Sequence, residues 1–270
     1  MRVSIAAPAR FVVSASLTDK EVKKLRDDTP GVKKGVKHFN NAGCSLPPKP
    51  VLDAGLKMLT REAELGGYEA AEETALQLLR VYGSLGSLLK CSPDDVAVVP
   101  SATIGWQQAF YGVAAGFKEG DRILTCSTEY GSNYMSYLQA AKRTGCVVEV
   151  IPEDAEGQVD VAALEGMVDA RTKLIAISHV PTSTGIVQPA IAVGRVARAA
   201  GVPYLLDACQ SAGQMPLDVS ILGCDFLTGT SRKYLRGPRG AGFVYVSPSA
   251  IAGGFEPGAI DVRGATWDGE

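Results

Sequence analysis

Short apolar runs alternate with helix-like segments along most of this chain, and that alternation limits the possible folds more than any other feature. Seven apolar runs follow residue 90, and most of them lack the polar alternation of a half-exposed strand: 96–99, 123–126, 147–151, 174–178, 204–207, 226–228 and 242–246. Such runs are typical of strands that are covered on both faces. The helix candidates between them are residues 106–117, 132–144, 161–168 and 190–200. We therefore predict an α/β fold with a doubly wound, mostly parallel seven-stranded sheet and right-handed crossovers.

A helical region precedes the predicted sheet. The sequence predicts two helices within residues 49–89, one on either side of Gly66 and Gly67. The second helix, from 70 to 89, carries apolar residues at helical spacing. Within the sheet, Asp207 is the last residue of an apolar run. Ligands of doubly wound sheets bind beyond the carboxyl ends of the strands, so we expect functional residues there.

Size and charge exclude several kinds of partner. With 270 residues, of which 46% are hydrophobic and 21% charged, the chain can bury a large core. Its net charge of −2 provides no broad basic field, so we expect no nucleic-acid partner. No apolar run approaches the roughly 18 to 20 residues of a membrane span, so we expect no membrane partner.

The cysteines argue against a metal site and against a disulfide scaffold. Six of them are scattered without a C-x-x-C pair, and the chain has only two histidines. This usage favours a reducing compartment, and we predict a cytoplasmic protein. The first eighteen residues contain two arginines and no acid, which also fits an organellar transit peptide, so import into an organelle stays open.

Asp207 and Lys233 form the residue pair that points most directly to a chemistry. Lys233 follows Asp207 by 26 residues, with one apolar segment between them. A lysine amine can hold the aldehyde cofactor pyridoxal 5'-phosphate (PLP) as a Schiff base, and a carboxylate against a pyridine nitrogen keeps that nitrogen protonated. The spacing alone also allows Lys233 to be a surface lysine, and Asp207 to be a metal ligand or a helix N-cap.

Two further segments extend this pattern into a family resemblance. Residues 101–103, Ser-Ala-Thr, open a helix after the first strand, and residues 40–43, Asn-Asn-Ala-Gly, precede the helical region. Together with residues 207–210, Asp-Ala-Cys-Gln, and 230–233, Thr-Ser-Arg-Lys, they make the chain resemble the class V aminotransferase family from about residue 39 to residue 267. That family consists of fold-type I PLP enzymes, among them cysteine desulfurases, kynureninase-like enzymes and isopenicillin N epimerase-like proteins.

The resemblance implies a domain organisation. Residues 39–250 would form a three-layer α/β/α PLP-binding large domain, and residues 1–38 an N-terminal extension that leads into it. Residues 251–270 would begin a linker to the smaller C-terminal domain that family members usually have, and we expect that domain to be absent here. The resemblance also implies a homodimer that acts on a small amino-acid substrate.

The family's site residues carry over to matching positions. The resemblance implies that Lys233 forms the Schiff base and that Asp207 faces the ring nitrogen, while the remaining cofactor contacts would come from Ala102, Thr103, Tyr130, Thr182, Gln210, Thr230 and Arg232. The first two, at a helix start, and the last two would hold the phosphate. Taken alone, residues 101–103 are equally an ordinary Ser/Thr N-cap, and Ser183 could replace Thr182.

Tyr130 marks a departure from one branch of the family. Cysteine desulfurases use a histidine in the segment that matches residues 129–133, and this chain has none there. Tyr130 would stack on the ring and act as an acid beside the Schiff base, so we assign it a catalytic role with Lys233 and Asp207. Asn41, Ala42 and Gly43 would line the substrate pocket through backbone groups.

Five other residues are of types that often serve in catalysis or binding, but we expect structural roles or packing for them. We expect His179 to be a buried structural histidine and Trp106 to pack in the core. Cys209 is expected to lie packed beneath the cofactor ring and not to act as a nucleophile. Arg236 and Arg239 are expected to pair with acids or with a neighbouring subunit.

The predicted function is that of a PLP-dependent enzyme acting on an amino acid through Lys233, by transamination, C–S cleavage or epimerisation. The missing histidine favours these chemistries over cysteine desulfuration. A cysteine desulfurase-like enzyme and a truncated, non-catalytic PLP-binding protein stay as alternatives. A dinucleotide-binding function is disfavoured because no G-x-G-x-x-G motif follows the first strand.

Overall fold

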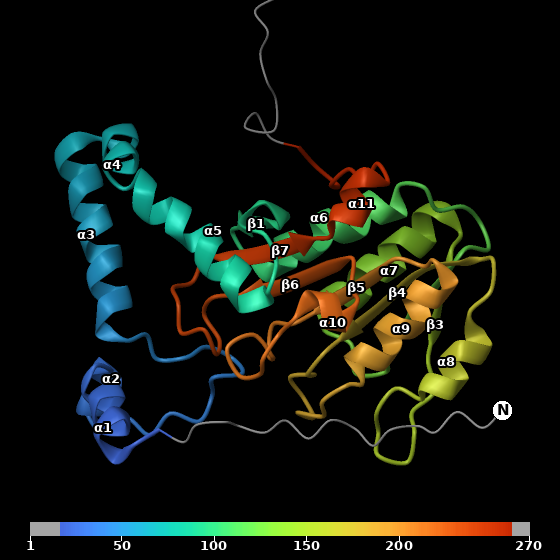
Figure 1. Cartoon of the computed structure of the whole chain (residues 1–270), viewed down its shortest axis with the longest axis horizontal. Helices are drawn as coiled ribbons and strands as arrows, with labels where there is room; N and C mark the ends of the chain where they lie inside the picture. The colour runs from blue at the N-terminus through green and yellow to red at the C-terminus, as the bar shows by residue number, and fades with distance from the viewer. Residues whose placement is uncertain (1–16, 261–270) are drawn as a thin grey trace, which may run out of the picture.

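A seven-stranded sheet forms the centre of the protein, in a computed structural model that describes residues 17–260 (Figure 1). The strands are β1 Val96–Val99, β2 Arg122–Thr125, β3 Val147–Val150, β4 Thr172–Ser178, β5 Tyr204–Asp207, β6 Phe226–Thr230 and β7 Gly242–Val246. All seven coincide with the apolar runs to within three residues at either end. The predicted strands are therefore confirmed.

The strand order is β1-β7-β6-β5-β4-β2-β3. The five strands from β6 to β3 in that order pair in parallel, and β7 pairs antiparallel with both β1 and β6. Six strands thus run in one direction, so their carboxyl ends lie along the same edge of the sheet. This arrangement confirms the mostly parallel sheet.

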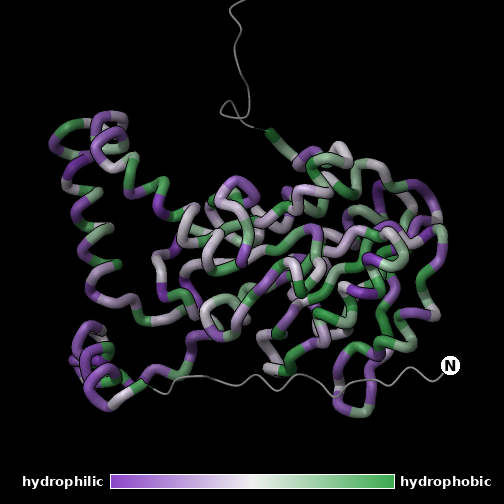
Figure 2. The backbone as a smooth tube through the Cα atoms, in the orientation of Figure 1, coloured by the Kyte–Doolittle hydropathy of each residue, from purple (hydrophilic) through white to green (hydrophobic). Residues whose placement is uncertain are grey.

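Helices cover both faces of the sheet (Figure 1). One face carries α6 (Ala102–Ala114) and α7 (Gly131–Thr144), whose aromatic residues Trp106, Phe110 and Tyr137 are buried against it. The other face carries α8 (Val161–Met167), α9 (Ala190–Ala200), α10 (Val219–Leu222) and the end of α5 (Ala75–Leu89). Hydrophobic segments concentrate in the sheet and in these helices (Figure 2). The fold is the predicted three-layer α/β/α sandwich.

Helix α6 begins at Ala102, four residues before the predicted helical segment 106–117 and within the Ser-Ala-Thr segment that was expected to open it. Ser101 caps it, because the Ser101 Oγ accepts a hydrogen bond from the Ile104 N–H at 3.2 Å. The cap makes helical an otherwise weakly helix-forming segment that contains Thr103 and Gly105. This shift matters because it places Ala102 and Thr103 in the first turn of the helix, next to the edge where the strands end.

The region before the sheet contains one more helix than predicted. It divides into α3 (Lys49–Leu65), α4 (Gly67–Glu73) and α5. The break at Thr74 was not foreseen, and its cause is local: the Thr74 Oγ1 donates to the carbonyls of Ala70 and Ala71 at 3.0 and 3.2 Å. Such back-bonding competes with the helical pattern and bends or ends a helix. Helix α3 consequently stands away from the sheet (Figure 1).

Two short helices, α1 (Asp19–Asp27) and α2 (Pro30–Lys33), precede this region, and α11 (Pro248–Ala252) follows the last strand. Arg236 ties the N-terminal part to the domain, because its Nη2 donates to the Thr29 Oγ1 at 2.7 Å and to the Leu46 carbonyl at 3.2 Å. Its expected partner was an acid or a neighbouring subunit. The structure instead gives it partners within its own chain.

Within residues 17–260, no helix has the length and apolar character needed to cross a membrane. The same residues contain no group of three or more His, Cys, Asp or Glu side chains placed to hold a metal ion. The first sixteen residues, which include most of the segment compared with a transit peptide, lie outside the described residues.

Candidate active site

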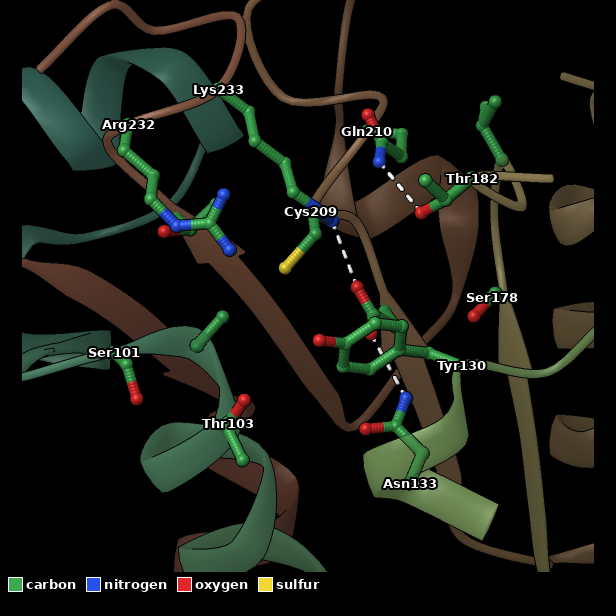
Figure 3. Close-up of a pocket in the computed structure, with 14 residues that line it drawn as sticks. Ser101, Thr103, Tyr130, Asn133, Ser178, Thr182, Cys209, Gln210, Arg232 and Lys233 are labelled. Carbon is green, nitrogen blue, oxygen red and sulfur yellow. Dashed lines mark hydrogen bonds between the residues drawn. The ribbon is translucent and has the colours of Figure 1, made fainter. Parts of the chain in front are cut away.

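A cavity opens where the carboxyl ends of five strands meet, and its walls come from the residues that end or follow them (Figure 3). The contributing strands are β1, β2, β4, β5 and β6. The lining residues are Ser101, Ala102, Thr103, Tyr130, Asn133, Ser178, Val180, Thr182, Asp207, Cys209, Gln210, Thr230, Arg232 and Lys233. All nine residues that the sequence assigned to cofactor binding are among them.

Strand register sets the position of Asp207. Ser178 on β4 pairs with Asp207 on β5, which pairs in turn with Thr228 on β6. Residues in register on parallel strands project to the same face, so the three polar side chains form one row across the sheet. They are 4%, 6% and 0% exposed, respectively. Buried polar side chains of this kind need hydrogen-bond partners, either other polar groups of the protein or a ligand.

Asp207 receives a hydrogen bond on each carboxylate oxygen. The Cys209 backbone N–H donates to Oδ1 at 2.9 Å, and the Asn133 Nδ2 donates to Oδ2 at 2.9 Å (Figure 3). Both donors are neutral N–H groups, and each carboxylate oxygen acts as an acceptor. The geometry suits a negative charge that is held in a defined orientation at the cavity wall.

Lys233 reaches into the same cavity from the turn after β6 (Figure 3). It is only 5% exposed. Among the described residues, no carboxylate lies within 4 Å of its Nζ, and its amine lies 5.7 Å from the centroid of the Tyr130 ring. A lysine that is buried without an acidic partner is suited to covalent chemistry at its amine.

The first turn of α6 gives the cavity an anion-binding end. Its leading backbone N–H groups, those of Ala102 and Thr103, have no acceptor within the helix. Gly242 on β7 lies directly behind them, since a Cβ at that position would stand 2.6 Å from the Ala102 nitrogen. The Thr103 and Thr230 side chains and the Arg232 guanidinium also border this end. Backbone donors, hydroxyls and a guanidinium together are the groups that bind phosphate.

Two cavity residues hold the segment that contains Ala42 and Gly43. The Gln210 Nε2 donates to the Ala42 carbonyl at 3.0 Å and to the Thr182 Oγ1 at 2.7 Å. The Arg232 Nη1 donates to the Gly43 carbonyl. The three residues predicted to line a substrate pocket, Asn41 to Gly43, are not part of the cavity wall itself, but two of them are tied to it through their carbonyls.

One observation, independent of the family resemblance, indicates that the residues present fit PLP. Two buried side-chain atoms of the described residues have no hydrogen-bond partner, the Gln210 Oε1 and the Thr228 Oγ1. Gln210 follows Asp207 by three residues, and Thr228 pairs with Asp207 in the sheet. Of these two residues only Gln210 lines the cavity, and an unsatisfied buried polar atom at a cavity wall indicates a bound polar group. Lys233 could hold the aldehyde, Asp207 could face the ring nitrogen and the α6 terminus could bind the phosphate, so the residues present would fit PLP.

Two structural assignments made from the sequence are confirmed. His179 is buried, its Nδ1 lies 3.0 Å from the Ser211 Oγ, and burial lowers its pKa to about 4. Trp106 is 2% exposed and stacks on Phe110. The expectation that Cys209 packs beneath a cofactor ring stays a prediction; Cys209 borders the cavity, and burial together with the neighbouring Asp207 raises the pKa of its thiol.

Asn133 and Ser178 belong to the site, but neither received a role from the sequence. Asn133 is 1% exposed and contacts Asp207 directly, although the two residues are 74 positions apart. Ser178 donates from its Oγ to the Glu129 Oε1 at 2.6 Å. A buried asparagine on the first turn of a helix after a strand end was the one available signal, and it is a weak one.

Comparison with known proteins agrees with this geometry. The family model described as aminotransferase class-V matches residues 38–259. A probable cysteine desulfurase of Methanothermobacter thermautotrophicus is 30% identical over 238 residues, which cover 86% of this chain. The chain spans 58% of the length of that relative.

Two solved structures extend the comparison. A lysine-to-alanine mutant of C-DES with glycine covalently linked to the PLP cofactor superposes with a TM-score of 0.83 at 25% identity, covering 90% of this chain and 64% of that one. The cystine C–S lyase C-DES in complex with its reaction product, cysteine persulfide, superposes with a TM-score of 0.73 at 26% identity, covering 80% and 58%.

Proposed function

The chain belongs to the aminotransferase class V family, and from that premise we propose that it is a PLP-dependent enzyme which cleaves a C–S bond of a cysteine-type amino acid. The observation that carries the proposal is the convergence of Lys233, Asp207 and the first turn of α6 on one cavity. These are the three separate groups that PLP needs for its aldehyde, its ring nitrogen and its phosphate.

When bound at Lys233, PLP supplies an aldehyde carbon for the substrate amine and a pyridinium ring that draws electrons from the α-carbon. Asp207 would face the ring nitrogen and keep it protonated, because the Cys209 N–H and the Asn133 amide donate to its two carboxylate oxygens. Lys233 would hold the cofactor aldehyde, and its Nζ, when free of that link, would serve as the base for the proton on the substrate α-carbon.

Tyr130 supports a second proton transfer. Its ring lies 5.7 Å from the Lys233 Nζ, and 42% of the residue is exposed, so its phenol can reach a ligand in the cavity. We assign its O–H the role of the acid that protonates the departing sulfur. A tyrosine in this position replaces the histidine that desulfurases use in the matching segment, and it provides both an aromatic face and a proton.

The similar proteins favour C–S cleavage over transamination and epimerisation. Their names state cysteine desulfuration and cystine C–S lysis. Sulfur-containing amino acids are therefore the first substrates to test. The non-catalytic alternative is less well supported, because Lys233 lacks an acidic partner among the described residues, and a purely structural lysine at 5% exposure would need one.

We expect the purified chain, incubated with PLP, to release sulfur from L-cysteine or L-cystine, with a requirement for PLP. Alanine as the carbon product indicates desulfuration, while pyruvate with ammonia indicates elimination. Both products can be quantified by mass spectrometry in the same reaction. Lys173→Ala, at an exposed position on β4, is the matched control and should react as the unaltered chain does. The absence of PLP binding, or of any product from either amino acid, would contradict the proposal.

We also propose that the protein is a homodimer. Helices α3 and α5 expose leucines that no described residue covers, and each is at least 44% exposed: Leu52, Leu56, Leu59, Leu76, Leu78 and Leu79. Apolar surface of this extent is typical of an interaction site. Sedimentation velocity should give twice the mass of one chain, and Leu56→Glu with Leu59→Glu should lower it to one, whereas Ile221→Glu on α10 should not. A wild-type mass of one chain would contradict the proposal.

A further inference from the structure

A buried carboxylate behind Asp207 has no part in the reaction as described above. It belongs to Glu129, which follows β2 and precedes α7. Although Glu129 is only half-buried as a residue, its carboxylate points inward and accepts five hydrogen bonds. The donors are the Tyr130 backbone N–H at 2.6 Å, the Ser178 Oγ at 2.6 Å, the Tyr137 hydroxyl at 2.9 Å, the Asn133 Nδ2 at 3.1 Å and the Thr125 Oγ1 at 3.3 Å.

Asn133 links this carboxylate to the one at the cavity wall. Its Nδ2 donates to the Glu129 Oε1 at 3.1 Å and to the Asp207 Oδ2 at 2.9 Å. An amide nitrogen carries two hydrogens, so one goes to each carboxylate. The opposite orientation of the amide would place its carbonyl oxygen against two carboxylates. The two acids therefore determine which way Asn133 points, and Asn133 in turn has no freedom to turn its donor away from Asp207.

Glu129 costs free energy to keep in place, which argues for a role. Burial, with the neighbouring Asp207, raises the pKa of Glu129. Its hydrogen bonds oppose that shift but do not abolish it. If Glu129 only filled space, a neutral side chain would do so at a lower cost in folding free energy. A carboxylate is needed at this position if it orients the hydrogen-bond donor of Asp207.

We propose that Asn133, held by Glu129, is a positioning residue for Asp207: it fixes the plane of the Asp207 carboxylate and supplies one of the two hydrogen bonds that keep it facing the cavity. The proposal rests on the PLP-binding role of Asp207 given under the proposed function. Asn133 does not react itself. It acts through Asp207, so its removal should matter only while Asp207 carries its charge.

That dependence defines the experiment, a double-mutant cycle between Asn133→Leu and Asp207→Asn. Leucine keeps the branched shape of asparagine and removes both hydrogen bonds. In the unaltered background we expect Asn133→Leu to lower kcat about tenfold or more, to change KM less than threefold, and to weaken PLP binding measurably in an absorbance titration. In the Asp207→Asn background, the same substitution should change kcat and the PLP dissociation constant less than twofold.

Two further variants complete the cycle. Ser136→Ala is the matched control on the same helix, because Ser136 is equally buried but bonds only to the Ser132 carbonyl, and it should leave kcat and PLP binding unchanged. Glu129→Gln keeps the shape of the anchor and removes its charge, so it should lower kcat in the same direction as Asn133→Leu, but less. It also replaces Asn133→Leu in the cycle should that variant fail to fold, as judged by circular dichroism without PLP.

The outcomes separate this inference from the proposed function. An equal effect of Asn133→Leu in both backgrounds, on kcat and on PLP binding, would overturn the positioning role and leave the function standing. The same conclusion would follow from a wild-type response to Glu129→Gln and Asn133→Leu alike. Failure of the unaltered chain to bind PLP at all would instead overturn the function on which the inference rests.

Discussion

Replacing Lys233 by alanine should abolish covalent retention of PLP and lower turnover by about a thousandfold or more. The reason is that Lys233 supplies both the amine that holds the aldehyde and the base for the α-proton. Borohydride reduction followed by peptide mass spectrometry should find one phosphopyridoxyl group on the peptide containing Lys233 in the unaltered chain and none in the variant.

The fold should survive this substitution. Lys233 is buried without a carboxylate partner among the described residues, so alanine removes a desolvated amine and breaks no ion pair. We expect the free energy of unfolding of the PLP-free chain to change by less than ~1 kcal/mol. Lys173→Ala is the control for both measurements. A phosphopyridoxyl group found on another lysine in the unaltered chain would show that the assignment is wrong.

Replacing Asp207 by asparagine should slow the reaction far more than it weakens PLP binding. The substitution removes the negative charge that holds the ring nitrogen protonated, and the carbanion then loses its electron sink. We expect kcat to fall at least a hundredfold, equivalent to ~3 kcal/mol or more in activation free energy, with a smaller change in the PLP dissociation constant. Steady-state kinetics and absorbance titration measure the two quantities.

A structural cost should accompany the loss of charge. The Cys209 N–H and the Asn133 Nδ2 each donate to one oxygen of Asp207, and an asparagine has only one oxygen to offer. Whichever way the new amide turns, its NH₂ group faces one of these donors, so we expect a loss of ~1–3 kcal/mol in unfolding free energy. Asp160→Asn, at the N-cap of α8, is the control, because asparagine caps a helix nearly as well as aspartate. A kcat within threefold of the original would show that Asp207 does not face the ring nitrogen.

Much of the fold was predictable because it depends on local residue types. Continuous apolar runs such as 204–207 have a strand as their simplest outcome, and all seven predicted strands formed. Helix ends were less predictable, since single side chains decide them. The Ser-Ala-Thr segment indicated where α6 begins, but the Thr74 hydroxyl divided a helix that the apolar pattern predicted as continuous.

The spacing of Asp207 and Lys233 by itself left other interpretations of the two residues open, and the family resemblance supplied the nine cofactor-binding residues. The segments that carry this resemblance include Ser-Ala-Thr at 101–103, Asp-Ala-Cys-Gln at 207–210 and Thr-Ser-Arg-Lys at 230–233, and the structure places all nine residues around one cavity. Their shared location follows from a topological rule, because residues at the carboxyl ends of parallel strands meet at one edge.

The tertiary structure alone decided which side chains touch. The order of β4, β5 and β6 and their register put Ser178, Asp207 and Thr228 in one row, and the packing of α7 on that face brought Asn133 to Asp207 across 74 residues. It also turned Gln210 and Arg232 partly toward the carbonyls of Ala42 and Gly43. Such contacts depend on how strands and helices pack over long sequence separations. Residue types determined what this site can do, and packing determined how its acidic group is held in place.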